Sequence, residues 1–512
     1  MDEVIGADRR MVRHPAPTGA LDAGALPRRP HVVVVGGGIA GLAAATGLAE
    51  RGVGVEVVER EPYLGGRAGG WTESLPDGTE VPMSRGFHAF FRQYYNLRGL
   101  LRRADPGLER LVALEDYPLL DADGNQDSFR GLPRTPPWNA LAFALRSPTF
   151  GVADLLRINA RTAASLAAVS VPRTYAELDD HDAESFLRDI NFPSAARALA
   201  FRVFSRSFFA PPARMSAAEL ATMFHIYFLG SSEGLVFDVA DAGFDSALWE
   251  PLREYLRALG AGFRTRTAVT GVQTADGGFR VHDDTGGAVE ADGVVLATDV
   301  RGLREVVETS AGLGDPEWRE SVRSLRTAPP FLVQRLWLDR PVHADRPAFL
   351  GTAGFGPLDN VSVLERFDGD AKAWTRRTGG SVVETHAYSA SGGAAETTTA
   401  LREQLRRVYP ETASARVVGE LTRWGADCPL FGVGDFARRP GVRTPHDGLV
   451  LAGDGVRIDL PVALMERAAT TGWHAANCLL ARWGLAGHPV YAVPNAGRVG
   501  PLRWLAERTR QA

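Results

Sequence analysis

The stretch that decides the fold is His31-Val-Val-Val-Val-Gly-Gly-Gly-Ile-Ala-Gly-Leu-Ala-Ala-Ala45. Four consecutive valines predict a strand that is buried on both faces, and the alanine-rich run after the glycines predicts a helix. Between them, Gly36-x-Gly38-x-x-Gly41 matches the glycine fingerprint of a dinucleotide-binding βαβ unit. Its glycines allow a tight turn, close approach of a pyrophosphate and close helix packing.

The residues around the fingerprint supply the rest of this unit. Ile39 and Ala40 open the predicted helix, whose free N–H groups and partial positive charge suit a pyrophosphate. A second predicted strand, residues 53–58, ends at Glu59, where a carboxylate would bind the ribose hydroxyls. Together these features predict a bound dinucleotide, and the alternative is a bare glycine turn in an ordinary βαβ unit.

A second glycine pair follows at once, in Glu59-Arg60-Glu-Pro-Tyr-Leu-Gly65-Gly66-Arg67. This sequence resembles a segment of the FAD-dependent amine oxidase and carotenoid desaturase superfamily. The resemblance implies that the loop backbone and the arginine approach the phosphates and the flavin of FAD, and a guanidinium can bind phosphate through two hydrogen bonds. An exposed turn with an accidental arginine is the alternative.

Two later segments extend the resemblance. Leu449-Val-Leu-Ala-Gly453-Asp454 predicts a buried strand that ends in a glycine and an acid, which in the superfamily reach the pyrophosphate and the ribityl chain. A helix from about Val462, carrying Met465, would aim its N-terminus at the flavin. The resemblance also places the adenine near Val269. A capped strand-to-helix turn is the alternative for the third segment.

Two departures from the amine oxidases argue against an amine substrate. The position before the Met-Glu pair is commonly aromatic in those enzymes and is Leu464 here. Their flavin-proximal lysine would fall on the strand over residues 331–338, where Gln334 or Arg335 stands, while the single lysine, Lys372, lies elsewhere. An apolar substrate is favoured instead.

The stretch Arg85-Gly-Phe-His88-Ala-Phe-Phe-Arg-Gln-Tyr94-Tyr95 closely resembles the carotenoid β-ring desaturase/methyltransferase group, the isorenieratene and chlorobactene synthases. The resemblance implies aromatisation of a β-ionone ring with a methyl shift, and it makes Arg85, His88 and Tyr94 the candidate catalytic residues. The aromatic side chains would shape an apolar tunnel and stabilise a cationic ring, and His88 would accept a proton. The alternative is an aromatic core cluster with a structural histidine.

The expected fold class is α/β: a Rossmann-like FAD-binding domain built from discontinuous segments, with an α+β substrate domain of mixed sheet capped by helices. We expect a disordered tail over 1–30, the FAD-binding domain over 31–95, 243–300 and 441–484, the substrate domain over 96–242 and 301–440, and a C-terminal tail over 485–512. Among other elements, the pattern predicts helices over 216–229, 244–259 and 397–408 and a β meander over 263–297, with a capping box at Ser216-Ala-Ala-Glu219.

Composition excludes several function classes. A net charge of -4 argues against nucleic acid as the main partner, and two widely spaced cysteines predict neither a disulfide framework nor a metal site. Residues 32–49 are uncharged for 18 residues, but their glycines favour the βαβ unit over a membrane span. We therefore expect a cytoplasmic protein that does not span the bilayer. Because the carotenoid substrate that the resemblance implies partitions into lipid, we also expect peripheral binding to the inner face of the cell membrane.

The expected membrane-facing stretch is residues 133–169, where apolar and basic side chains alternate: Trp138, Leu141, Phe143, Leu145, Phe150, Leu155 and Leu156 with Arg134, Arg146, Arg157 and Arg161. A helical lid with a solvated arginine face is the alternative. No second fingerprint appears, since Gly351-x-x-Gly354-x-Gly356 lacks the spacing and the helix. Reduced flavin would therefore pass its electrons to dioxygen or to a diffusible or membrane acceptor such as a quinone.

The sequence thus favours FAD-dependent oxidation of a carotenoid β-ring to an aromatic ring. Two alternatives stay open at this point. One is a phytoene-type or other carotenoid desaturase that acts on a linear polyene. The other, of a different class, is a flavin-dependent isomerase without net oxidation or a carotenoid-binding protein.

Overall fold

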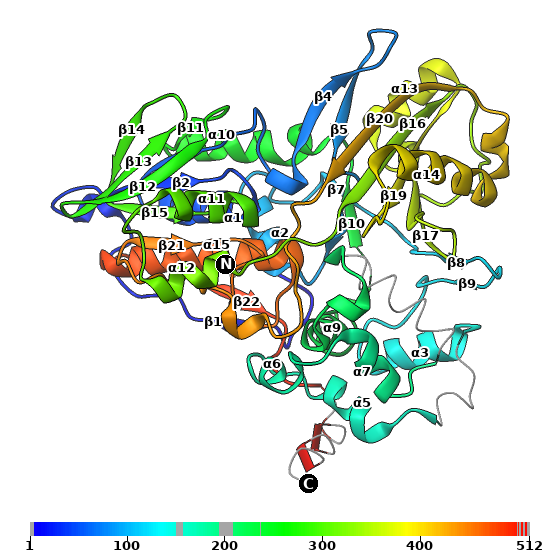
Figure 1. The fold of residues 1–512 in the computed structure, drawn as a ribbon, viewed down its shortest axis with the longest axis horizontal. Coiled ribbons are helices and arrows are strands. Elements are labelled where there is room, and N and C mark those ends of the chain that lie inside the picture. Colours follow the sequence, from blue (N-terminus) through cyan, green and yellow to red (C-terminus); the bar gives the residue numbers. More distant parts are fainter. Residues whose placement is uncertain are drawn as a thin grey trace.

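A computed structural model describes residues 5–149, 157–193, 208–235, 237–498, 500, 503–504 and 507–508. Its first sheet is parallel and contains the expected valine strand (Figure 1). The order is β11 (Gly262–Arg264), β3 (Gly54–Val58), β2 (His31–Val35), β15 (Gly293–Leu296) and β21 (Leu449–Leu451). These strands come from the three segments expected to form the FAD-binding domain, whose exact limits stay a prediction.

Helices cover this sheet closely. α1 (Ile39–Ala49) follows the glycine fingerprint directly and packs along α15 (Leu464–Arg482). The two helices approach so closely that a Cβ on Gly472 would lie 2.8 Å from the Cβ of Ala43. The helices that complete this half of the molecule are α2 (Tyr95–Leu101), α10 (Glu250–Ala258), α11 (Val300–Thr309) and α12 (Pro316–Arg323).

The β meander expected over residues 263–297 is divided between two sheets. β12 (Val269–Ala275), β13 (Gly278–Asp283) and β14 (Ala288–Ala291) form an antiparallel sheet of their own. The strands at its two ends, β11 and β15, instead join the parallel sheet.

The second large sheet has seven strands and is mixed. Its order is β20 (Val417–Gly425), β16 (Phe331–Leu338), β19 (Ser381–Ala387), β18 (Asn360–Val363), β17 (Phe349–Ala353), β8 (Leu119–Asp121) and β9 (Gln126–Asp127). The pairing is antiparallel except between β17 and β8. Every residue of β16 is buried, as its apolar run predicts for a central strand. α13 (Gly369–Thr378) and α14 (Ala394–Val408) lie beside it, the latter three residues longer than expected.

A helical group lies below this sheet in Figure 1. It comprises α3 (Trp138–Arg146), α5 (Ala160–Ala167), α6 (Arg173–Leu178), α7 (Ala183–Asp189) and α9 (Ala217–Phe224). Small antiparallel sheets connect the parts: β6 (Phe90–Phe91), β10 (Phe237–Ala240) and β7 (Leu111–Ala113), and the hairpin of β4 (Gly70–Ser74) with β5 (Glu80–Ser84). No helix within the described ranges is long and apolar enough to cross a membrane.

The expected disorder of the N-terminal tail is wrong for residues 5–30, and residues 485–498 are likewise packed. β1 (Val12–His14) pairs antiparallel with β22 (Val490–Ala492), and the Arg498 guanidinium pairs with Asp8. Short strands that pair through the backbone leave little trace in composition, which is why the sequence missed them.

The capping box is half confirmed. Ser216 caps α9, because its hydroxyl oxygen accepts a hydrogen bond from the Ala218 N–H (3.1 Å). Glu219 does not reach back to the cap. Its fully buried carboxylate instead binds the Arg439 guanidinium (2.7 Å) and the Arg467 guanidinium (2.8 Å). Those arginines are more than two hundred residues away in sequence, which the local pattern does not reveal.

Candidate active site

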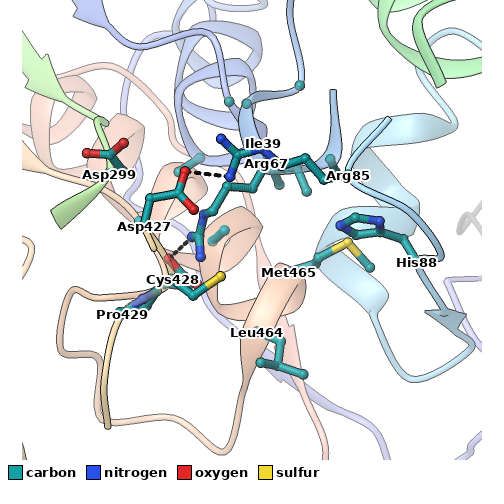
Figure 2. Close-up of a pocket in the computed structure, with 18 of the residues that line it drawn as sticks. Ile39, Arg67, Arg85, His88, Asp299, Asp427, Cys428, Pro429, Leu464 and Met465 are labelled. Carbon is teal, nitrogen blue, oxygen red and sulfur yellow. Dashed lines mark hydrogen bonds and ion pairs between the residues drawn. The ribbon is translucent and has the colours of Figure 1, made fainter. Parts of the chain in front are cut away.

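A cavity of about 600 Å³ is lined by residues from both large sheets and from the helical group. All of the sequence-predicted site residues line it except Gly41. One part of its wall is formed by the glycine loops and polar side chains at the edge of the parallel sheet. Another part is formed by aromatic side chains. Figure 2 shows the part of the lining around Arg67, Asp427 and His88.

The three fingerprint glycines have different structural tasks. Gly36 has φ +107°, which favours glycine, and a Cβ there would lie 2.6 Å from the Ala297 carbonyl oxygen. A Cβ on Gly41 would overlap the Gly36 carbonyl oxygen, so Gly41 serves helix packing. A Cβ on Gly38 would meet only the Gly66 Cα, at 3.8 Å. Gly38 therefore borders open cavity, as a residue that a pyrophosphate approaches must do.

Polar groups follow along the edge of the sheet. Glu59 accepts hydrogen bonds from the Gly37 N–H (2.7 Å) and the Glu61 N–H (2.8 Å), and burial raises its pKa above the usual value. The Arg60 guanidinium pairs with Asp299 at 3.0 Å, and Val269 lines the same cavity. The acid is thus held in place by backbone donors, as a ribose-binding carboxylate requires.

The second and third glycine segments meet across the cavity. Gly65 and Gly66 have positive φ, and a Cβ on Gly65 would collide with the Trp249 indole. The Arg67 guanidinium pairs with the Asp454 carboxylate, which follows Gly453. Residues almost four hundred positions apart therefore form one ion pair at the centre of the predicted FAD site.

The helix behind this pair begins at Leu464, two residues later than expected. Leu464 has φ +54°, a conformation that is strained for a side chain of this kind. Both Leu464 and Met465 line the cavity. The sequence singled out Leu464 only as the residue that replaces an aromatic, and its backbone strain is a finding of the structure.

His88 is half-buried in the cavity wall and is neutral. Its Nδ1 lies 2.8 Å from the Gly86 carbonyl oxygen, so Nδ1 carries the hydrogen and Nε2 keeps its lone pair. Burial lowers the pKa of His88 to about 4, against the effect of that hydrogen bond. The imidazole is therefore in the form that can accept a proton at neutral pH.

The other two candidate catalytic residues are tied to partners. The Arg85 guanidinium pairs with Asp427 (Figure 2), and the Tyr94 hydroxyl lies 2.6 Å from that of Tyr227. Burial raises the pKa of Tyr94 well above its usual value, so this phenol stays protonated. Both residues line the cavity, but neither offers a free base.

The sequence placed Gln334 or Arg335 where amine oxidases have a lysine close to the flavin, and the structure corrects this expectation. Gln334 donates from Nε2 to the Glu420 carboxylate (2.6 Å), and Arg335 binds Glu384. Neither of these side chains lines the cavity, and Lys372 lies on α13. Phe331 is the β16 residue that faces the cavity, because its end of the strand is the one that reaches it. Within the described ranges, no group of His, Cys, Asp and Glu is placed to hold a metal ion.

Comparison with known proteins agrees with this geometry. Residues 39–480 match the family model described as flavin-containing amine oxidoreductase. The chain belongs to this family. It is accordingly an FAD-dependent oxidoreductase, and the glycine cradle, the buried Glu59 and the Arg67–Asp454 pair are the described groups that fit this cofactor.

Two relatives in sequence and one solved structure extend the comparison. The chain is 57% identical to carotenoid phi-ring synthase of Streptomyces griseus, over 98% of this chain and 97% of that one. It is 27% identical to carotenoid phi-ring synthase of Chlorobaculum tepidum, over 91% and 90% of the two chains. Among solved structures, putrescine oxidase bound to putrescine has the same fold, with a TM-score of 0.66, 17% identity and coverage of 89% and 100%.

The structure adds aromatic residues to the cavity wall beyond those of the Arg85–Tyr95 stretch, which the sequence already assigned to an apolar tunnel. Of that stretch, Phe87, Phe91 and Tyr94 line the cavity, whereas Phe90 and Tyr95 do not. The other lining aromatics come from strands, helices and loops far away in sequence, without a local motif. Apart from Tyr63, which precedes the Gly65–Gly66 pair, the aromatic lining comprises Phe87, Phe91, Tyr94, Tyr117, Phe129, Phe208, Phe209, Tyr227, Phe237, Phe331, Phe349, Tyr388 and Phe431.

Proposed function

We propose that this oxidoreductase converts the β-ionone ring of a carotenoid into an aromatic ring, by hydride removal and an intramolecular 1,2-methyl shift. The observation that supports it is the aromatic lining, which continues the FAD site into an apolar space. Tyr117 stacks on Phe349 with ring centroids 4.9 Å apart, and Phe87 lies 4.3 Å from the same ring. Such a wall fits a hydrocarbon ring and suits a cationic one.

The chemistry divides between the cofactor and the chain. FAD, when bound, supplies the hydride acceptor. Gly36, Gly38, Gly65 and Gly66 would hold it together with the Arg67–Asp454 pair. Loss of a hydride from an allylic carbon leaves an electron-deficient ring, which draws the methyl group from the neighbouring gem-dimethyl carbon.

The residues of the chain then stabilise the cationic ring and accept the proton that it loses. Aromatic faces along the cavity stabilise the cation, and loss of a proton to Nε2 of His88 completes the new double bond. Conversion of a cyclohexene to an arene needs two such oxidations, so two hydrides and two protons leave each ring. The methyl shift is intramolecular and needs no methyl donor.

A linear polyene is the second candidate substrate. The chain is 24% identical, over 88% of its length, to zeta-carotene desaturase of Synechocystis, whose name describes a desaturation. Product analysis separates the two. Co-expression with a β-carotene pathway should give an aromatic carotenoid. An extended linear polyene from an acyclic precursor, with β-carotene unchanged, would overturn the ring assignment. Anaerobic bleaching of the flavin by the substrate would exclude a non-redox isomerase or a binding protein.

We further propose that α3 touches a membrane surface. Trp138, Leu141 and Leu145 share one face of this helix and are 61%, 45% and 65% exposed. Phe143 does not share that face, contrary to the expectation, because it stacks on the cavity-lining Phe129 with centroids 4.9 Å apart. The exposed apolar face thus lies directly behind the aromatic wall.

The other residues of the expected membrane-facing stretch are only partly described by the structure. Arg134 precedes α3 and Arg146 is its last residue; both are exposed and suited to lipid phosphates. Phe150, Leu155 and Leu156, and the Arg161 side chain, lie outside the part of the chain that the structure describes. Dioxygen or a membrane quinone stays the proposed electron acceptor.

A further inference from the structure

A second histidine, His386, lies directly behind the stretch that carries His88. Gly86 separates the two side chains: its carbonyl oxygen accepts the hydrogen bond from His88, and a Cβ on it would lie 2.5 Å from His386 Cε1. The close approach and the φ of +86° both require glycine. The Arg85–Tyr95 stretch therefore packs against β19 at its histidine.

His386 stands in the middle of a chain of hydrogen bonds that begins at the cavity. Tyr388 lines the cavity, and its hydroxyl lies 2.6 Å from His386 Nδ1. On the other side of the imidazole, His386 Nε2 lies 2.8 Å from Glu384 Oε1. Nε2 also lies 3.4 Å from the Phe87 nitrogen, but its contact with Glu384 is much shorter. Because an ionised carboxylate only accepts, Nε2 carries the hydrogen and Nδ1 accepts from the Tyr388 hydroxyl. The Asn360 amide donates to the same hydroxyl oxygen (3.1 Å).

The inner end of this chain is fixed and charged. Arg335 donates from Nε and Nη2 to Glu384 Oε2 (2.9 and 2.7 Å), and Glu384 is fully buried. Burial alone would raise the pKa of Glu384, but the charge of Arg335 and the bond from His386 outweigh it and hold the pKa at about 2. A carboxylate therefore faces the histidine at any working pH. An acid thus orients the histidine, and the histidine contacts the tyrosine hydroxyl. The same arrangement of acid, histidine and hydroxyl activates side chains in catalysis.

We propose that Tyr388, His386 and Glu384 form a second proton relay, which removes one of the two protons that leave each ring. The inference rests on the proposed function and adds residues that the Arg85–Tyr95 stretch does not contain. In this step a ring C–H bond breaks and its electron pair becomes the new double bond. The proton passes to the Tyr388 oxygen while the hydroxyl proton passes to His386 Nδ1.

Each partner makes this transfer easier. Burial raises the pKa of Tyr388, so the phenol does not act as a base by ionising first. Simultaneous transfer to His386 avoids a free phenolate, and the resulting imidazolium faces the Glu384 carboxylate. After the product leaves, the proton returns along the same bonds to the open cavity. His88 and Tyr388 thus divide the two deprotonations that one ring requires.

The test compares single-turnover formation of the aromatic product by full-length, FAD-loaded protein in H2O and in D2O, with β-carotene as the probe. In the wild type, D2O should slow the step, because the Tyr388 and His386 protons exchange with solvent and move during it. Tyr388→Phe should lower the rate ~10²–10⁴-fold and remove the isotope effect, with the flavin spectrum unchanged. Tyr409→Phe is the matched control: this buried tyrosine lies outside the cavity, and its hydroxyl has no hydrogen-bond partner in the described part of the chain.

The outcomes separate the two proposals. A wild type that leaves β-carotene unchanged contradicts the proposed function itself. A wild type that aromatises the ring at equal rates in H2O and D2O overturns the relay alone, and this comparison decides even if Tyr388→Phe fails to hold FAD. A slow Tyr388→Phe variant that keeps the wild-type isotope effect also overturns the relay, because the tyrosine would then only position the ring.

Discussion

The buried carboxylate of Glu219 allows a prediction with a magnitude. Glu219 is fully buried between Arg439 and Arg467, and both guanidinium groups also lie over the ring of Phe431, at 4.7 and 4.8 Å from its centroid. Phe431 lines the cavity, and Arg467 belongs to α15. The substitution Glu219→Gln would leave two buried cations side by side, without the charge that compensates them.

Two estimates of the cost agree. The charges of Arg467 and Arg439 overcome the effect of burial and hold the pKa of Glu219 at about 2, against an ordinary value of 4.5. At 1.36 kcal/mol per pKa unit, this difference corresponds to roughly 3 kcal/mol. Removing one partner of a buried ion pair typically costs about 3–5 kcal/mol. We therefore expect Glu219→Gln to lower the free energy of unfolding by about 3 kcal/mol at pH 7.

Urea unfolding followed by tryptophan fluorescence and by flavin release measures this change. The matched control is Glu320→Gln, which breaks a 2.6 Å pair with Arg323 on the surface of α12. More than half of each side chain is exposed there, so the cost should stay within ~0.5 kcal/mol.

The stability difference between wild type and Glu219→Gln should also depend on pH in a definite direction. Because the folded pKa of Glu219 is depressed, its stabilisation is present above pH 4.5 and is lost as the pH falls towards 2. The difference between wild type and Glu219→Gln should therefore shrink over that range. Equal stability at pH 7, or a difference that grows as the pH falls, would refute the reasoning.

Three further predictions concern the site and the surface. Gly38→Val should fold but lack a flavin spectrum, because its new side chain would project into the cavity where non-covalent FAD binds; full FAD occupancy would contradict the assignment. His88→Ala should keep FAD and lose ~10²–10⁴-fold of turnover, whereas wild-type turnover of β-carotene would make the histidine structural. In liposome flotation, the wild type should rise with anionic vesicles, and the Arg134→Glu, Arg146→Glu, Arg157→Glu triple variant should not. Wild-type protein that stays at the bottom would exclude the membrane contact.

Local sequence was enough for the nucleotide end of the site. Neighbouring residues determine three features here: the strand at Val32–Val35, the turn at Gly36 and the start of α1 at Ile39. The apolar run forms the strand, and the backbone freedom of glycine allows the turn. The structure has them where the sequence predicts them. Glu59 likewise follows its strand directly and lies on the cavity wall.

Only the tertiary structure decided which distant side chains act together. Glu219 has the spacing of a capping residue, yet two arginines from other elements bind it, because a buried carboxylate needs charge that the helix cannot supply. His386 belongs to the buried strand β19 and Tyr388 follows its last residue, without any motif, and the pairing of β19 with its neighbours brings His386 behind Gly86. Hydrogen bonds and ion pairs of this range depend on how the sheets pack, and periodicity along one segment contains no information about that packing.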